Sequence, residues 1–316
     1  MSERNVYYLI EGSEGGLGVQ VSDIQQQFVS AIQTCFPNNP VEFVPRGKIR
    51  NAIRATVKEL SSSGEVFVVS LSRLYYPNAD DYIDCNRIVS KDGSTLGIGP
   101  RPKTYDLSVQ VKSVMDKADG RVVVVVDDTL FHGESIRGLR ALGLEFDTVV
   151  VYFADRGSSR SLTEQGYTVH ASLETAGYLD VLPVHDFLPF VPLCGKVVGK
   201  SVYGKPSPIV VPPGVSLSLP YIIPFILPEQ VHSWASIPLE HVQEYSEFAL
   251  GQTMELFRRL KGVGVVSIAD YIHSNPPRRS LPMSVGLRRQ MFESLPIDYQ
   301  EPILDYLGRT LHAFRG

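Results

Sequence analysis

The sequence is poor in cysteine, with only three in 316 residues. Cys35, Cys85 and Cys194 are far apart in the chain, so the close pairs typical of disulfide frameworks and Cys-based zinc sites are missing. An odd and sparse set of cysteines favours a reducing compartment, and we expect a cytoplasmic protein. The first residues also lack a basic stretch followed by an apolar one, so we expect no secretion signal.

Neither sign of charge is in large excess. The net charge is −4 and 20% of the residues are charged, which argues against bulk attraction to nucleic acid or to an anionic membrane. Four basic residues nevertheless recur at every fourth position and would form one stripe on a helix: Arg46, Arg50, Arg54 and Lys58. Two interpretations remain open, a solvated face and a contact with nucleic acid or another phosphate-bearing partner.

The sequence has no apolar run free of proline that could cross a membrane. The most apolar segment, 207–228, is interrupted by Pro208, Pro212, Pro213, Pro220, Pro224 and Pro228. Each proline inside a helix costs about 3 kcal/mol, so we expect no membrane span here. The alternative that we favour is extended chain packed over a core, as a lid or as a contact in a homo-oligomer.

Two common phosphate-binding motifs are missing as well. No glycine-rich turn ends in Lys-Ser or Lys-Thr, and no G-x-G-x-x-G follows a strand. The segment "VVVVDDTLFHGES" (123–135) offers a different arrangement, in which Asp127 and Asp128 follow a valine run and Gly133 and Ser135 precede or begin a helix. Backbone N–H groups at a helix start bind phosphate, and two carboxylates can accept hydrogen bonds from vicinal hydroxyls. This segment therefore predicts a sugar-phosphate site.

Alternating strand-like and helix-like patterns predict an α/β fold, a parallel sheet with helices on both faces, over residues 1–190. The residues from 73 to 103 lack a regular pattern, and we expect them to be irregular. We expect a proline-rich segment and a mainly helical C-terminal region over residues 191–316. The expected strands are 5–12, 41–45, 65–72, 121–128, 146–157 and 167–173, and the expected helices are 21–36, 48–64, 105–120, 134–143, 159–166, 238–262, 267–274, 285–295 and 299–314.

The segment 123–135 resembles the phosphoribosyl-diphosphate (PRPP) loop of type I phosphoribosyltransferases. That loop has four apolar residues, two acids, several loop residues and then Gly-x-Thr/Ser. Phe131 and His132 depart from the pattern, because the family usually has small hydroxylic residues there. The resemblance implies that Asp127 and Asp128 hold the ribose hydroxyls. It also implies that the 5′-phosphate is wrapped by Thr129, Leu130, Phe131, His132, Gly133, Glu134 and Ser135.

Two further segments fit the order of that family, so that the resemblance covers roughly residues 40–175. "VVSLSRL" (68–74) lies where the family has its pyrophosphate loop, which implies that Arg73 pairs with the diphosphate and that Ser70 and Ser72 donate to it. "VVVYFADRG" (149–157) lies where the family often ends a strand in Asp-Arg beside the base pocket, here Asp155 and Arg156. The plainer interpretations are a surface or ion-paired arginine, an ion pair at a strand end, and an acid cluster before a helix.

The family resemblance implies a glycosyltransferase of nucleotide metabolism. Such an enzyme transfers phosphoribose from PRPP to a nitrogen nucleophile, releases pyrophosphate, and uses Mg²⁺ bound through the diphosphate rather than in a protein metal site. The acceptor is left open by the sequence. The alternative is a regulatory or effector protein of the same fold, which binds PRPP or a nucleotide without turnover.

Overall fold

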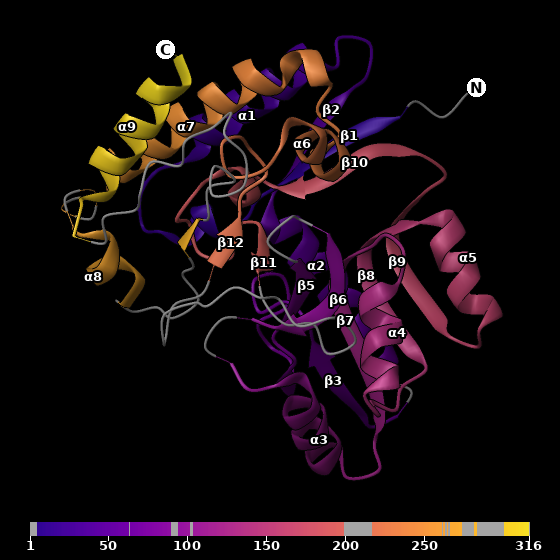
Figure 1. Ribbon diagram of the computed structural model, residues 1–316. Coiled ribbons are helices and arrows are strands. Elements are labelled where there is room, and N and C mark those ends of the chain that lie inside the picture. The colour runs from indigo at the N-terminus through magenta and orange to yellow at the C-terminus, as the bar shows by residue number, and fades with distance from the viewer. Residues whose placement is uncertain are drawn as a thin grey trace.

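The computed structural model describes residues 5–62, 64–89, 94–101, 104–198, 217–260, 262, 264, 266–273, 281–282 and 300–315. Its largest layer is a five-stranded sheet in the order β4-β3-β7-β8-β9, in which all neighbouring strands are parallel (Figure 1). These strands are β3 (Val66–Ser70), β4 (Asp81–Tyr82), β7 (Val122–Leu130), β8 (Thr148–Asp155) and β9 (Thr168–Thr175).

Helices cover both faces of this sheet. One face packs against α2 (Arg46–Ser62), and the other packs against α3 (Leu107–Ala118), α4 (Glu134–Ala141) and α5 (Arg156–Glu164). The valine run of β7 explains the two cores, because successive side chains of a strand point to opposite faces. Val124 and Val126 lie in the cluster with α2, whereas Val123 and Val125 lie in the cluster with the other three helices.

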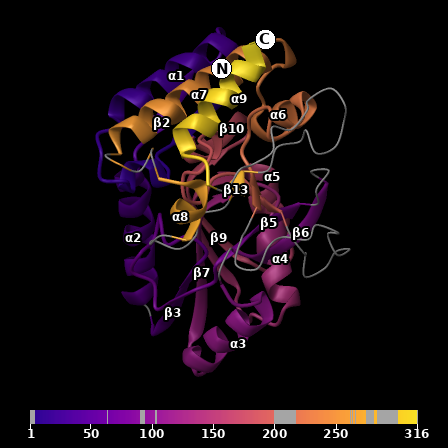
Figure 2. The ribbon, with the colours of Figure 1, turned by 60° about the vertical axis from the view of Figure 1, so that its left-hand side comes forward.

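A second, three-stranded sheet joins distant parts of the chain. Its order is β10-β1-β2, and β1 (Val6–Ile10) pairs in parallel with both β2 (Val41–Val44) and β10 (Tyr178–Pro183). On this side of the molecule α1 (Ser22–Cys35) lies beside α7 (Val242–Arg259), which in turn contacts α9 (Ile303–Arg315) (Figure 2).

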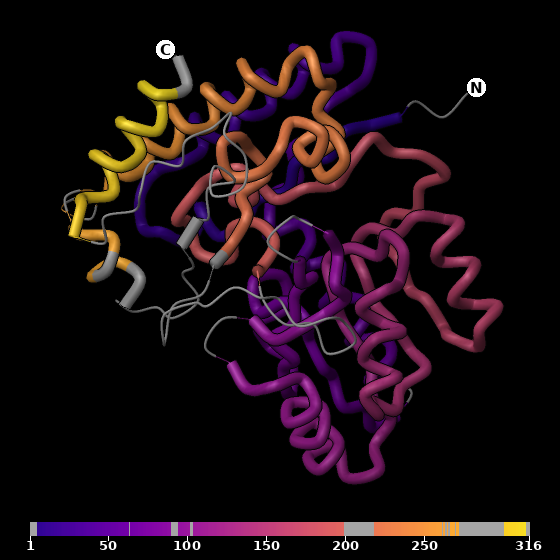
Figure 3. The backbone as a smooth tube through the Cα atoms, in the orientation of Figure 1, coloured from indigo at the N-terminus to yellow at the C-terminus, as the bar shows by residue number. Residues whose placement is uncertain are grey.

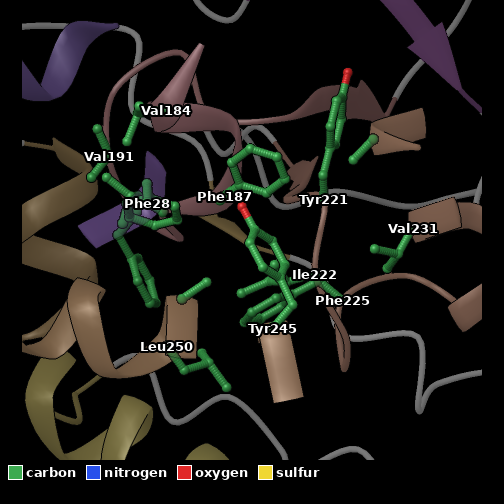
Figure 4. Close-up of a cluster of buried hydrophobic side chains, with 14 of the residues drawn as sticks. Phe28, Val184, Phe187, Val191, Tyr221, Ile222, Phe225, Val231, Tyr245 and Leu250 are labelled. Atoms are coloured by element: carbon green, nitrogen blue, oxygen red, sulfur yellow. The ribbon is translucent and has the colours of Figure 1, made fainter. Parts of the chain in front are cut away.

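The core between these elements is aromatic and unites the two ends of the chain. Phe28 of α1 stacks on Phe187 with ring centroids 5.9 Å apart, and Phe187 lies 5.2 Å from the ring of Tyr245 in α7. Figure 4 shows this cluster, to which Tyr221 and Leu250 also belong. The division at residue 190 stays a prediction, and the hydrophobic cluster contains residues from both sides of it.

A third sheet, of order β13-β12-β11-β5-β6, includes part of the segment expected to be irregular. That expectation was wrong for β5 (Cys85–Val89) and β6 (Thr95–Pro100), which form an antiparallel pair with a register shift between Ile88 and Val89. Its other strands are β11 (Lys196–Val198), β12 (Leu217–Leu219) and β13 (Leu281–Pro282). The irregular pairing explains why no alternation marks these strands in the sequence.

The remaining elements are short. They are η1 (Ser13–Gly16), η2 (Val184–Phe187), η3 (Leu239–His241), α6 (Pro228–Ala235) and α8 (Ile268–His273). Figure 3 shows the described parts of the backbone as a coloured tube. The expected helix 285–295 and the first half of the proline-rich segment lie outside the described residues. The expected α/β class is confirmed: parallel sheets are flanked by helices, and a helix lies in the C-terminal region.

Candidate functional site

The carboxyl ends of β3 and β7 border a cavity of about 180 Å³. Its walls come from the ends of these strands, from β5 and Arg101, and from the turn after β10. A smaller cavity of about 60 Å³ adjoins it along the β7–α4 connection and shares Asp127, Thr129 and Phe131 with it. Parallel α/β sheets bind their ligands at this edge, so we describe the two cavities together as the cleft.

Asp127 and Asp128 both line the cleft, and both are partly exposed to it. They lie within β7, which continues past them to Leu130. The Asp128 N–H donates to Asp127 Oδ1 at 2.9 Å, and the Thr129 hydroxyl donates to Asp128 Oδ2 at 3.1 Å. Burial and the neighbouring Asp128 carboxylate raise the pKa of Asp127 well above its usual value, and burial also raises the pKa of Asp128. Both carboxyls are therefore harder to ionise than isolated aspartates.

The connection between β7 and α4 is only three residues long, because Thr129 and Leu130 belong to the strand. Gly133, at the N-cap of α4, has a φ of 67°, a left-handed conformation that glycine adopts without steric cost. The Arg137 guanidinium donates to the His132 carbonyl and ties the turn to the helix. Glu134 and Ser135 occupy the first turn of α4, where N–H groups lack acceptors within the helix. These N–H groups can therefore serve an anion.

Phe131 occupies the position at which the resembling family has a small residue. Its ring packs edge-to-face on Tyr178, with centroids 5.4 Å apart, and the Arg87 guanidinium lies 5.9 Å from its centroid. The Ser158 hydroxyl donates to the Phe131 carbonyl. Phe131 thus links the β7–α4 connection to β10, to α5 and to a cationic side chain.

Of the three residues expected at a diphosphate, only Ser72 lines the cleft. The Ser70 side chain is buried, and its hydroxyl donates to the Ser72 carbonyl at 3.0 Å. Arg73 pairs with Asp84 at 3.3 Å, and its guanidinium lies 3.7 Å from the ring centroid of Tyr82. The structure does not bring Arg73 to the acid pair, and its role with a diphosphate stays a prediction.

Asp155 and Arg156 do not line the cleft either. Asp155 is the N-cap of α5, and its Oδ1 accepts a hydrogen bond from the Ser158 N–H at 2.8 Å. Arg156 is the first residue of that helix and is exposed. This capping bond explains why α5 begins three residues earlier than the sequence pattern predicts.

Two arginines that the sequence did not single out reach the cleft. Arg87 is on β5 and Arg101 follows β6, and both are partly exposed. Within the described residues, neither guanidinium makes an ion pair or a hydrogen bond to a side chain or carbonyl. Arg101 lowers the pKa of both Asp127 and Asp128, although burial outweighs it. The cleft therefore contains two cations available to an anionic ligand near two carboxylates.

A third group of side chains was also missed by the sequence analysis. His185 and Asp186, on the η2 turn, line the cleft although each is less than a tenth exposed. Nδ1 of His185 accepts a 3.0 Å hydrogen bond from the Ser13 N–H, and Asp186 Oδ1 accepts one of 2.9 Å from the Gly195 N–H. Burial lowers the pKa of His185 to about 3 and raises that of Asp186 to about 7. No local spacing marks this pair, because its partners are far away in the chain.

Half of the basic stripe on α2 is used within the protein. Arg46 pairs with Glu11 at 3.2 Å, and Arg50 Nε donates to the Leu74 carbonyl at 2.9 Å. Arg54 and Lys58 are exposed. A partner for the stripe remains untested, and only these last two side chains are fully presented to solvent.

In the part of the chain that the structure describes, no group of three or more His, Cys, Asp or Glu side chains could hold a metal ion. None of the helices in the described ranges combines the length and apolar character that crossing a membrane requires. A scan against protein-family models and a search of curated proteins find no match for this sequence. The candidate site therefore rests on its own geometry and chemistry.

Proposed function

We propose that the cleft binds PRPP and that the protein transfers its phosphoribosyl group to a nitrogen nucleophile, as the resemblance to type I phosphoribosyltransferases implies. The supporting observation is one cleft that contains the acid pair Asp127–Asp128, the glycine turn before α4, and the two arginines Arg87 and Arg101. A ligand for this cleft needs hydroxyl donors for the carboxylates and negative charge for the arginines. A phosphorylated pentose with a diphosphate carries both.

Each part of the ligand has a chemically matched place in this proposal. Ribose hydroxyls donate to Asp127 and Asp128, which relieves the cost of holding adjacent carboxylates away from water. The 5′-phosphate accepts from the N–H groups at the first turn of α4. Arg87 and Arg101 stabilise the diphosphate as its negative charge grows on leaving.

The reaction needs positioning more than covalent chemistry. The nitrogen lone pair of the acceptor forms the new bond to C1, and the electron pair of the C1–O bond leaves with pyrophosphate. The cleft holds both reactants in one geometry, which is a large source of rate enhancement. Mg²⁺ would enter this cleft bound to the phosphate oxygens of the substrate, with waters completing its coordination.

A second candidate, a PRPP or nucleotide sensor without turnover, is favoured by one observation. Phe131 fills the β7–α4 connection with an aromatic ring held against Tyr178, where the resembling enzymes have small hydroxylic residues. Such a connection offers fewer side-chain donors to a phosphate. Both candidates use the same cleft and differ in whether the bound ligand, PRPP or a nucleotide, reacts.

Calorimetry with PRPP and Mg²⁺ tests the shared part of the proposal, and pyrophosphate release with a panel of nitrogen bases separates the two candidates. Binding with release is the result expected of the transferase, whereas binding without release identifies the sensor. A wild-type protein that binds neither PRPP nor ribose 5-phosphate would overturn the transferase, and one that also binds no nucleotide would overturn both.

A further inference from the structure

We propose that His185 and Asp186 form the acceptor site, and that they select a nitrogen base whose edge presents a carbonyl oxygen beside an N–H. In this site His185 donates to the carbonyl oxygen and Asp186 accepts the N–H beside it, while another ring nitrogen of the base attacks C1. The inference rests on the proposed phosphoribosyl transfer and adds to it the chemical class of the acceptor.

Both side chains reach the space in which the ribose is proposed to bind. They follow β10 on the η2 turn and line the same cavity as Asp127 and Asp128. Each is buried apart from its contact with this cavity, at 6% and 8% exposure. Polar side chains buried this deeply are normally hydrogen-bonded, so their remaining polar atoms call for a ligand.

The backbone of the protein fixes which nitrogen of His185 carries the proton. Nδ1 accepts from the Ser13 N–H at 3.0 Å, so in the neutral ring the proton is on Nε2. The low pKa of His185, about 3, keeps the ring neutral at physiological pH. Nε2 lies 3.7 Å from Asp186 Oδ1, too far for a good hydrogen bond. The Nε2–H group is therefore available to a ligand, and it can only donate a hydrogen bond.

Asp186 presents the complementary acceptor. Its Oδ1 is held by the Gly195 N–H at 2.9 Å, and within the described residues its Oδ2 has no hydrogen-bond partner. A donor and an acceptor thus stand side by side on one wall. A lactam or carboxamide edge matches this pair, whereas an edge with an amino group in place of the carbonyl would set a donor against the His185 N–H.

The proton balance of the transfer does not involve this pair. When the reacting nitrogen bonds to C1, its own proton passes to a phosphate oxygen of the leaving pyrophosphate, which also takes the C1–O electron pair. Burial raises the pKa of Asp186 to about 7, so the carboxylate that accepts the N–H forms as the pH rises through this value. The charged or titratable groups that act on Asp186 or contact it are Arg87, Arg101, Lys196, His185, Tyr7, Tyr75, Tyr221 and Cys194.

The test starts from the dissociation constant of PRPP with Mg²⁺, measured by calorimetry for the full-length protein and for Asp186→Asn, His185→Asn and His185→Gln. Hypoxanthine and uracil, which carry the lactam edge, are then compared with adenine, which has an amino group instead. The readouts are pyrophosphate release from the PRPP-saturated protein and equilibrium dialysis of each base.

We expect hypoxanthine or uracil to bind or react at least about tenfold better than adenine. Asp186→Asn and His185→Asn should lose that advantage while the dissociation constant of PRPP changes less than about threefold. His185→Gln should retain part of it, because its amide can place a donor near the position of Nε2.

The outcomes separate this inference from the proposed function. If PRPP binds, three results overturn the acceptor site and leave the PRPP site standing. They are no preference for lactam bases over adenine, no binding of either lactam base, and variants that behave like the wild type. Absence of PRPP binding by the wild type overturns the proposed function and the acceptor site with it.

Discussion

The imidazole Nδ1 of His185 accepts a hydrogen bond from the backbone N–H of Ser13, at 3.0 Å and across 172 positions of the chain. The Ser13 hydroxyl in turn donates to the Pro192 carbonyl. Behind the ring, Glu14 is fully buried, with its Oε2 4.0 Å from His185 Nδ1. The turn after β1 therefore sets the position of a side chain in the cleft.

Gly12→Ala should disturb this arrangement. A Cβ at position 12 would lie 2.0 Å from His185 Nδ1 and 2.6 Å from Glu14 Oε2, so the ring has to move. We expect a loss of about 1–3 kcal/mol in the free energy of unfolding and a shifted His185 signal in NMR spectra. Gly47→Ala is the control, since no atom lies within 4 Å of a Cβ there. Equal stability of the two variants would contradict the close packing of the ring.

Asp127→Asn and Asp128→Asn should each leave the fold intact and weaken the binding of PRPP. Each carboxylate is proposed to accept a ribose hydroxyl, and a hydrogen bond to a charged group contributes about 1.5–3 kcal/mol. The dissociation constant should therefore rise about tenfold to a hundredfold, as calorimetry with Mg²⁺ and PRPP would measure. Asp116→Asn, on the exposed face of α3, is the matched control. If both variants bind PRPP as tightly as the wild type, the pair is an acid cluster at a strand end and does not bind the ribose.

Arginine substitutions should show which arginines bind PRPP, those that line the cleft or Arg73 outside it. Arg87→Ala and Arg101→Ala remove cations that line the cleft, so each should weaken PRPP binding about tenfold or more. Arg73→Ala breaks a partly exposed pair with Asp84, which costs at most about 1 kcal/mol of stability, and it should change the PRPP affinity less than about twofold. A larger loss with Arg73→Ala than with the other two would restore Arg73 as the diphosphate ligand.

The stability of the ligand-free protein should fall as the pH rises from about 4 to 7. Burial raises the pKa of Glu14 and of Asp186 to about 7 and that of Asp180 to about 6. In this range the unfolded chain has released protons that the folded protein still holds, so stability decreases with pH. Asp127 and Asp128, whose pKa values are also raised, act in the same direction. His185 acts in the opposite direction, because its pKa falls from 6.5 to about 3, and Lys196, whose pKa falls from 10.5 to about 7, opposes the trend mainly above pH 7. Thermal unfolding measured from pH 4 to pH 7 would show the trend.

Glu14→Gln should flatten that pH profile and raise the unfolding temperature at pH 8. A pKa raised from 4.5 to about 7 corresponds to at most about 3 kcal/mol of destabilisation when the carboxyl is ionised. Its Oε2 is buried without a hydrogen-bond partner among the described residues, which agrees with that cost. Glu145→Gln, at an exposed position, is the control. An identical pH profile for Glu14→Gln and wild type would show that Glu14 does not titrate in this range.

The sequence predicts the elements whose patterns are local and misses those that depend on distant partners. The valine run of β7 and the helical spacing of α1 and α7 mark these elements directly. Strand β10 escaped notice because Tyr178–Pro183 becomes a strand by pairing with β1, far away in the sequence.

The candidate site divides in the same way. Asp127, Asp128 and the glycine turn are consecutive in the sequence, so a local motif reveals them. Arg87 and Arg101 reach the cleft only because the β5–β6 pair folds over the sheet edge. His185 and Asp186 are held in place by the N–H groups of Ser13 and Gly195, and no spacing rule connects these positions.

The position of β1 between β2 and β10 has a consequence for biosynthesis. A chain made from its N-terminus exposes β1 and the apolar face of α1 long before residues 178–183 and α7 have been translated. Pairings between such distant segments form slowly, and unpaired strand edges promote aggregation in the meantime. The wall of the cleft that includes His185 is therefore completed only after most of the chain has been made.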